Sequence, residues 1–434
     1  MTMSQTIYDA LIIGGGPGGS SAATYLAMAG KRVLLLEKEH FPRFHIGESL
    51  LPYNERIFRE IGVLPALEQA GFNRKYGAQF HLGNSSKSIK LTFRNGRFTR
   101  EPAAFQVDRA RFDQILLNNA RSRGADAREG WTVTRYSHHD DHVTIEAKSD
   151  SGETGTFQGR FLIDGSGRVN FTGNQEGLRV IHPHLKKLAI FGHFDGVRMD
   201  EGSKAGDILI VRLENKWFWL IPIYPNKVSV GCVMDQDEFV SMKISPAEAF
   251  DHIWRSSEEM RSRMENARLL NTIQTTGDFS YYNRQLVGPR LIRIGDAAGF
   301  MDPIFSAGVY LAMYSGKMAA NLIIDSLAEG SDGAERLKQY ERRVFRAMHY
   351  YWELVEHFYT TPFMELFLQP RKKFKIPDAI VAILAGELEG GFKLDWRRKF
   401  FFLLVKAQRH WPLVPRISFA NGETTRETCE VCPE

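Results

Sequence analysis

The chain has 434 residues, of which 43% are hydrophobic and 25% charged, and its formal net charge is +5. This is the composition of an ordinary globular protein with a substantial core in two closely joined domains, and the charge is too small to indicate a nucleic-acid partner. No run of about 18 apolar residues occurs, which excludes a membrane span, and three cysteines are too few for a disulfide scaffold. We expect a reducing, cytoplasmic setting.

A glycine-rich turn follows the first apolar run. Residues 10–13 (Ala-Leu-Ile-Ile) predict a short strand that is buried on both faces of a parallel sheet. Five glycines follow, of which Gly14, Gly16 and Gly19 give the GxGxxG spacing, and with Gly18 these are the candidate cofactor-binding glycines. In this spacing the first glycine permits a tight turn, the second admits a pyrophosphate and the third lets a helix pack on the strand.

A helix and a second strand complete this unit. The residues from Ser20 to Ala29 are small or helix-forming and predict a helix whose positive end faces the phosphates. Residues 33–36 predict a second buried strand, and Glu37 follows it where a carboxylate can accept from a ribose hydroxyl. Strand, glycines, helix, strand and acid in this order predict a Rossmann-type dinucleotide site.

The middle of the chain alternates between strand and helix patterns. Helices are expected over residues 54–70, 108–121 and 246–266. Strands are expected over residues 71–80, 89–98, 104–107, 131–135, 143–148 and 155–161, and repeatedly between 178 and 232. The last group, with a turn every 8 to 12 residues, predicts an inserted antiparallel sheet.

Two further buried strands lead back to the cofactor sheet. One ends at Asp164 and Gly165, and the other runs from Leu291 into Gly295 and Asp296. Helices are expected after them over residues 309–327 and 333–359, followed by several short ones to Arg409 in a region rich in aromatic residues. The sequence therefore predicts an α/β fold that closes with a helical region.

The glycine turn, Asp164-Gly165 and Gly295-Asp296 together resemble the three cofactor segments of FAD-dependent monooxygenases of the aromatic-hydroxylase type. By this resemblance Arg109 pairs with the FAD diphosphate and Asp296 accepts from the ribityl chain, as a guanidinium and a carboxylate can. The resemblance also implies cofactor contacts from Lys38, Arg43, Ser49, Pro303 and Gly308.

Residues Trp217, Trp219, Ile221 and Pro222 fit the WxWxIP motif of flavin-dependent halogenases. In that family the bulky rings keep substrate out of the flavin pocket, which is a packing role.

The segment from Gly71 to Phe80 resembles the halogenase segment that carries the catalytic lysine, which implies Lys75 as the catalytic residue. A lysine between two cavities can hydrogen-bond hypohalous acid or take its halogen as a haloamine.

Residues 300–308 resemble the halogenase segment beside the flavin, which implies that the backbone amides of Ala307 and Gly308 hold the halide. Tryptophan halogenases have a glutamate where this chain has Phe305, which favours an electron-rich phenol or pyrrole instead of tryptophan. The phenol and pyrrole branch usually has a tryptophan where this chain has Leu82.

These observations predict a FAD-dependent halogenase that uses chloride or bromide, oxygen and reduced FAD from a separate flavin reductase. Its aromatic substrate is free or tethered to a carrier protein, and no metal is required. Two alternatives stay open: an aromatic hydroxylase or geranylgeranyl-reductase-like enzyme with peripheral membrane contact, and a flavin-binding protein without turnover. Basic residues near the carboxyl end, such as Lys375 and Arg398, are expected to form a solvated face.

We expect a Rossmann-type FAD-binding domain over residues 1–177 that resumes over 286–330, with a mainly β substrate domain over 178–285 inserted between the two parts. A helical region is expected over 331–420, and a disordered tail over 421–434. Cys429 and Cys432 form a CxxC in this tail, for which half a metal site or a redox pair is the alternative.

Overall fold

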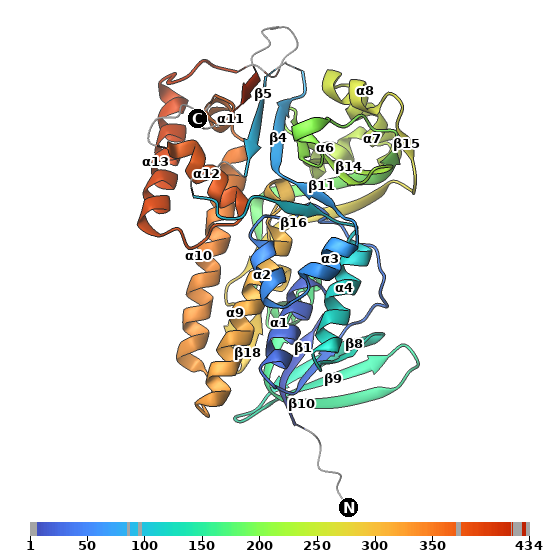
Figure 1. The fold of residues 1–434 in the computed structure, drawn as a ribbon, viewed down its shortest axis with the longest axis vertical. Helices are drawn as coiled ribbons and strands as arrows, with labels where there is room; N and C mark the ends of the chain where they lie inside the picture. The colour runs from blue at the N-terminus through green and yellow to red at the C-terminus, as the bar shows by residue number, and fades with distance from the viewer. Residues whose placement is uncertain are drawn as a thin grey trace, which may run out of the picture.

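The computed structural model describes residues 7–84, 87–93, 98–369, 375–417, 419 and 428–430. Two large sheets follow one another along the long axis of the molecule, and the carboxyl-terminal helices lie beside the second sheet (Figure 1). The arrangement confirms the predicted α/β class with a Rossmann-type amino-terminal unit.

The first sheet has the strand order β17-β18-β10-β1-β2-β7, in which the strands from β18 to β7 are parallel and β17 pairs antiparallel with β18. Strands β9 and β8 extend it in antiparallel pairing from β10. Its strands are β1 (Ile7–Ile13), β2 (Val33–Leu36), β7 (Asp126–Arg128), β8 (Trp131–His138), β9 (Val143–Ser149), β10 (Thr154–Asp164), β17 (Val287–Gly288) and β18 (Leu291–Arg293). Within β1, Ile12 packs into one hydrophobic cluster, whereas Leu11 and Ile13 pack into another. The strand is thus covered on both faces, as its continuous apolar run predicts.

Three helices cover one face of this sheet. They are α1 (Pro17–Met28), α4 (Arg109–Ser122) and α9 (Gly308–Ala328). Helices α1 and α9 cross closely, because a Cβ on Gly316 would lie only 2.6 Å from the carbonyl oxygen of Gly18. This crossing brings the start of α9 close to the glycine turn.

The second sheet has the order β19-β16-β11-β14-β13-β12-β4-β5-β20, with β15 paired to β11. Its strands are β4 (Gly77–Leu82), β5 (Ser88–Thr92), β11 (Arg179–Asp195), β12 (Ile208–Arg212), β13 (Trp217–Tyr224), β14 (Lys227–Asp235), β15 (Arg268–Leu269), β16 (Gln274–Asn283), β19 (Gly299–Phe300) and β20 (Thr428–Glu430). The sheet takes strands from outside residues 178–285, and it is not wholly antiparallel, because β4 runs parallel to β12.

Several predicted elements are interrupted. The helix expected over 54–70 is two helices, α2 (Asn54–Glu60) and α3 (Leu64–Gln69), because Gly62 between them has a φ of +73°. The strand expected over 71–80 is likewise divided into β3 (Asn73–Lys75), which pairs with β6 (Ala104–Gln106), and β4.

The other differences lie at element ends. Strand β5 ends at Thr92, and residues 94–97 of the strand expected over 89–98 lie outside the described residues. The helix expected over 246–266 is also two helices, α7 (Pro246–Arg255) and α8 (Glu258–Met264). The structure has two further short helices, α5 (Phe171–Gln175) and α6 (Gln236–Met242).

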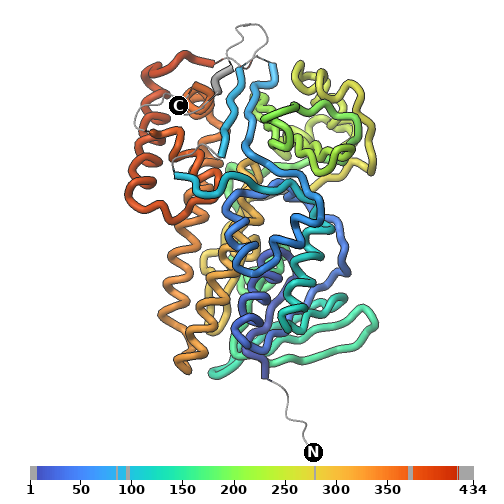
Figure 2. Tube along the Cα trace, in the orientation of Figure 1, coloured from blue at the N-terminus to red at the C-terminus, as the bar shows by residue number. Residues whose placement is uncertain are grey.

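The carboxyl-terminal helices are α10 (Ala334–Phe358), α11 (Thr361–Phe367), α12 (Ile376–Ala385) and α13 (Gly391–His410). The expectation of short helices after residue 359 was wrong for α13, which has 20 residues. Figure 2 shows α11, α12 and α13, in orange to red, beside the blue strands β4 and β5. In the part of the chain that is described, no helix is long and apolar enough to cross a membrane.

The predicted disordered tail is described only at β20, whose backbone pairs with Ser88–Lys90 of β5. The rest of that prediction, including Cys432, lies outside the described residues.

Candidate active site

The glycine turn between β1 and α1 leaves no room for side chains on its protein side. Gly14 has a φ of +95°, and a Cβ there would lie 2.4 Å from the carbonyl oxygen of Gly165. A Cβ on Gly19 would lie 2.0 Å from the carbonyl oxygen of Gly14. At Gly16 the nearest atom to an added Cβ is Arg43 Nη2, at 3.8 Å, so the turn is open on that side. A flat or phosphate-bearing group can therefore approach the backbone there.

The carboxylate of Glu37 is fixed at the end of β2. Its Oε2 accepts from the Gly15 amide at 2.6 Å and its Oε1 from the Glu39 amide at 2.9 Å. The side chain is buried beside the glycine turn, where a ribose would lie.

A cavity of about 470 Å³ opens next to this turn, with walls from both sheets; we call it the flavin cavity. The predicted site residues that line it are Gly14, Gly16, Gly18, Glu37, Lys38, Arg43, Ser49, Arg109, Gly165, Trp217, Trp219, Ile221, Asp296, Pro303, Ala307 and Gly308. The structure thus brings together residues that lie almost 300 positions apart in the sequence. The other predicted site residues, which are Gly19, Lys75, Asp164 and Pro222, do not line it.

Two arginines in the wall of the flavin cavity share a single carboxylate. Arg109 binds both oxygens of Asp113, at 2.8 and 2.9 Å, and Arg43 Nη1 lies 3.1 Å from the same carboxylate. The guanidiniums hold the pKa of the Asp113 carboxyl below its usual value despite its burial. Arg43 also pairs with Glu39, but its buried Nε and Nη1 have no hydrogen bond of good geometry among the described residues. A diphosphate would suit this cationic wall.

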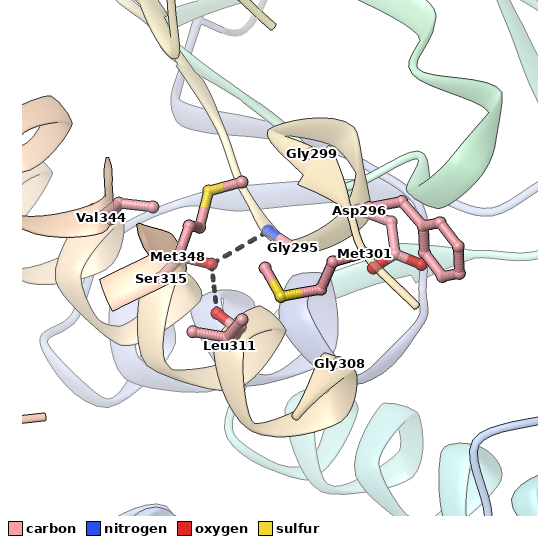
Figure 3. Close-up of a pocket in the computed structure, with 10 residues that line it drawn as sticks. Gly295, Asp296, Gly299, Met301, Gly308, Leu311, Ser315, Val344 and Met348 are labelled. Carbon is pink, nitrogen blue, oxygen red and sulfur yellow. Dashed lines mark hydrogen bonds between the residues drawn. The ribbon is translucent and has the colours of Figure 1, made fainter. Parts of the chain in front are cut away.

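Asp296 presents a carboxylate to the flavin cavity from the turn after β18. Burial raises the pKa of this carboxyl, while the cations Arg168 and Arg109 lower it. The turn is held to α9 by Ser315, whose hydroxyl accepts from the Gly295 amide at 3.0 Å and donates to the Leu311 carbonyl at 2.6 Å (Figure 3). Asp296 is therefore placed to accept hydrogen bonds from a polyol chain.

Lys75 is fully buried at the end of β3, behind the wall of the flavin cavity. Its Nζ donates to Ser49 Oγ at 2.9 Å and to the Leu50 carbonyl at 3.0 Å. Burial lowers the pKa of Lys75 to about 7, opposed in part by the charge of Asp207. Because Ser49 lines the flavin cavity, its hydroxyl connects Lys75 to that space.

Comparison with known proteins identifies the family to which this chain belongs. The sequence profile described as tryptophan halogenase matches residues 9–101 and 97–386. The chain belongs to the tryptophan halogenase family. It is a FAD-dependent halogenating enzyme, which confirms the predicted family, cofactor and use of halide.

Curated relatives cover most of this halogenase. The chain is 29% identical to the 1H-pyrrole-2-carbonyl peptidyl-carrier protein chlorinase of Pseudomonas fluorescens, over 91% of this chain and 92% of that protein. It is 34% identical to the corresponding brominase of Pseudoalteromonas luteoviolacea, over 75% and 79%. It is also 34% identical to the tryptophan 2-halogenase of Chondromyces crocatus, over 76% and 64%.

Solved structures have the same fold. The flavin-dependent brominase Bmp2 is 29% identical, with a TM-score of 0.83 over 93% of this chain and 100% of the other. A protein named flavoprotein/dehydrogenase from Cytophaga hutchinsonii is 25% identical, with a TM-score of 0.84 over 93% and 99%.

In this halogenase the tryptophan strand β13 divides its side chains between two hydrophobic clusters. Trp217, Trp219 and Ile221 face the flavin cavity, whereas Phe218 and Leu220 pack into the cluster on the other face. This alternation is the period of two that a strand imposes. Pro222 contributes its carbonyl, which accepts from Asn73 Nδ2 at 2.7 Å.

The side chain of Asp164 has a structural role. It is fully buried, and its Oδ2 accepts from the amide of Thr172 at 2.8 Å and from its hydroxyl at 2.6 Å. The structure thus uses this carboxylate to fix the turn after β10, and Gly165 beside it lines the flavin cavity.

Sequence reasoning missed a chain of hydrogen bonds behind the tryptophans. Trp217 Nε1 donates to Tyr359 Oη at 2.9 Å, and Tyr359 donates to Asp302 Oδ2 at 2.6 Å. No sequence signal joins a tyrosine at the end of α10 to this site, because the contact is long-range. Asp113 was also missed, although its spacing of four residues from Arg109 on a predicted helix was a usable signal.

A second buried pair was missed as well. Glu48 lines the flavin cavity, and its Oε1 lies 2.6 Å from His193 Nε2 of β11. Both side chains are buried, so this contact ties the loop between β2 and α2 to the second sheet at the cavity.

Proposed function

We propose that this halogenase chlorinates or brominates an electron-rich aromatic ring of the phenol or pyrrole type, with Lys75 handling the hypohalous acid. The observation that carries the proposal is Lys75 itself, a fully buried amine that Ser49 joins to the flavin cavity. Lysine side chains usually lie in solvent, and a buried lysine is usually paired with a carboxylate. Among the described residues Lys75 has no ion pair of good geometry, so its burial points to a role in the chemistry.

The residues of the flavin cavity fit FAD. Arg43 and Arg109 would hold the diphosphate at the glycine turn, Glu37 the ribose and Asp296 the ribityl chain, with further contacts from the other predicted cavity residues. Bound reduced FAD supplies, with oxygen, the oxidising equivalents that convert halide into hypohalous acid. No nicotinamide site was identified in the sequence, so a separate flavin reductase is the expected partner.

The halide would bind at the start of α9. The first amides of a helix have no partner within it, and the backbone of Ala307 and Gly308 lies here in the wall of the flavin cavity. Nothing lies within 4 Å of the position that a Cβ on Gly308 would take, so an ion has room beside it.

Lys75 would receive the hypohalous acid and orient it by hydrogen bonding. With a pKa of about 7, the amine changes protonation state near neutral pH and can donate a proton or hold one. The ring carbon then bonds to the halogen as the oxygen–halogen bond breaks, and the departing hydroxide takes the ring proton to give water. The balance is one aromatic C–H and one hypohalous acid to one aromatic C–halogen bond and one water.

The substrate class rests on two observations. Phe305, a buried ring beside Phe358, occupies the position where a carboxylate would assist attack on an indole, so the ring must be electron-rich by itself. Two relatives are named as halogenases of pyrrole groups on a carrier protein. A pyrrole or phenol, free or on a carrier, is therefore the substrate to test first.

The test combines the protein with a flavin reductase, FAD, NADH, bromide and a panel of pyrroles, phenols and tryptophan. Isotope patterns in mass spectra should show monobrominated pyrrole or phenol with wild-type protein and at least 100-fold less with Lys75→Met. FAD titration should give both proteins the same affinity, because Lys75 does not line the flavin cavity. Equal yields from the two proteins would remove Lys75 from the chemistry, and hydroxylated products without bromine would favour the hydroxylase alternative.

A further inference from the structure

A second cavity, of about 250 Å³, lies between β5 and the helices α11–α13; we call it the apolar cavity. Its walls include Ile89 and Leu91 from β5, Phe367 from α11, and Phe401 and Leu404 from α13. Among the described lining residues Gln369 alone has a polar side chain, and its amide already donates to the Pro415 carbonyl at 3.3 Å. A ligand of this cavity gains burial of apolar surface and no polar contacts, so it must be a hydrocarbon group.

The apolar cavity lies against the same face of the second sheet as the flavin cavity. Across the ladder β5-β4-β12-β13, Ile89 pairs with Phe80, Phe80 with Ile210, and Ile210 with Trp219. Directly paired residues point to the same face, so Ile89 and Trp219 belong to one continuous row. Three strand spacings separate them, which is roughly 14 Å at about 4.8 Å per spacing.

Phenylalanine rings connect the two cavities above this row. Phe80 of β4 contacts Phe367 with ring centroids 4.9 Å apart, and Phe367 stacks on Phe363 at 5.3 Å. Phe363 lies 6.3 Å from Phe358, which lies 5.7 Å from Phe305. Phe305 immediately precedes Ser306 and Ala307, which line the flavin cavity. Packed aromatic rings therefore occupy the region between the two cavities.

Lys75 lies beside Phe93, which comes just after the end of β5. Phe93 follows Leu91 by two residues and so continues the face that carries Ile89 and Leu91. The ring centroid of Phe93 is 5.6 Å from Lys75 Nζ. An apolar chain in the cavity would thus point towards Phe93 and the amine behind it.

We propose that the substrate of this halogenase carries an extended alkyl or acyl chain that lies in the apolar cavity, with its aromatic ring at Phe93 and Lys75. The proposal names the substrate class of the proposed function and rests on that function. Each methylene that enters the cavity should improve kcat/KM about fourfold until the cavity is full, which corresponds to the usual transfer free energy of a buried methylene.

Leu404 and Leu403 offer a matched pair of variants on α13. Leu404 lines the apolar cavity, whereas Leu403 is 58% exposed. Leu404→Trp should fill the cavity, and Leu403→Trp adds the same ring to the surface. Neither residue lines the flavin cavity, so FAD affinity and melting temperature report whether each variant has folded. If Leu404→Trp does not fold, Ile380→Phe fills the same cavity from α12.

The experiment measures bromination of 4-alkylphenols from methyl to octyl. Wild type and Leu403→Trp should show kcat/KM rising with chain length, and Leu404→Trp should lose at least tenfold on 4-octylphenol while keeping its rate on 4-methylphenol. A flat dependence on chain length in wild type, or the same slope in Leu404→Trp, would overturn the proposal.

A binding measurement separates this proposal from the proposed function. The neutral probe N-phenyl-1-naphthylamine should fluoresce on wild type and Leu403→Trp, be displaced by 4-octylphenol, and not bind Leu404→Trp. If no phenol is halogenated but this pattern holds, the apolar cavity binds alkyl chains and the function needs revision. If phenols are halogenated but the probe binds all three proteins equally, the function stands and the proposal for the cavity fails.

Discussion

The flavin cavity and the apolar cavity lie on one face of the same sheet, yet they are specified by different kinds of residues. The flavin cavity depends on glycines that admit no side chain and on charges with fixed partners, such as Arg109 with Asp113. The apolar cavity depends on bulky side chains of α11–α13, which tolerate exchange for others of similar volume. Single substitutions should therefore abolish function at the first cavity and only adjust selectivity at the second.

The largest effect that would sharpen this contrast is expected for Gly14→Ala. The added Cβ would lie 2.4 Å from the Gly165 carbonyl oxygen, at a φ of +95° that alanine rarely adopts. We expect FAD affinity to fall more than 100-fold, measured by quenching of flavin fluorescence. Gly30→Ala is the matched control, because Gly30 has a φ of +70° but nothing within 4 Å of an added Cβ. FAD affinity of Gly14→Ala within tenfold of wild type would show that the turn is less constrained than described.

An intermediate effect is expected at Lys75, whose burial should make the free energy of unfolding depend on pH. The pKa of Lys75 is lowered from 10.5 to about 7 by burial, so between these values the unfolded chain binds more protons than the folded one. The free energy of unfolding should consequently rise with pH from about 7 to 10.5. Lys75→Met should lack this rise and, below pH 7, should be more stable than wild type by a few kcal/mol.

Urea denaturation at pH 6, 8 and 10 would measure this difference. Lys393→Met, at an exposed position of α13, serves as the control and should follow the wild-type curve. Parallel pH profiles for wild type and Lys75→Met would mean that the amine is solvated.

The smallest effect is expected for Tyr359→Phe, which breaks the hydrogen bonds behind the tryptophan strand. The variant leaves Trp217 Nε1 and the buried Asp302 carboxylate without this partner, which should lower the free energy of unfolding by about 1–3 kcal/mol. Because Asp302 precedes the segment at the start of α9, KM for bromide should rise several-fold with little change in kcat. Tyr350→Phe removes a hydroxyl of α10 that binds Asp395 of α13, and it should leave the bromide KM unchanged. An unchanged bromide KM in both variants would limit Tyr359 to a packing role.

The two cavities also differ in how well the sequence predicts them. The glycine turn and its flanking elements were readable from the sequence, because steric exclusion at Gly14 and Gly19, and a carboxylate at the end of β2, leave a local pattern. Asp302 and Tyr359 were not, because they meet only through the folding of α10 onto the second sheet.

The ends of helices were predicted less well where the conformation of a single residue ends the helix. Gly62 divides a predicted helix by adopting a left-handed conformation, which its apolar pattern does not reveal. The apolar cavity has no local signature, because each of its leucines and phenylalanines would suit an ordinary core equally well.

Helix α10 sets the spacing between the two sheets. Near its start, Tyr340 donates to the Arg293 carbonyl of the first sheet at 2.7 Å, and just past its end Tyr359 is bonded to Trp217 of the second sheet. The helix has 25 residues, or roughly 37 Å at about 1.5 Å per residue, and so acts as a strut of fixed length. Adding or removing one residue within it would turn Tyr359 by about 100° relative to Tyr340, so the two ends could not both keep their partners. The length of α10 therefore determines the distance between the glycine turn and the tryptophan strand, although no side chain of α10 lines the flavin cavity.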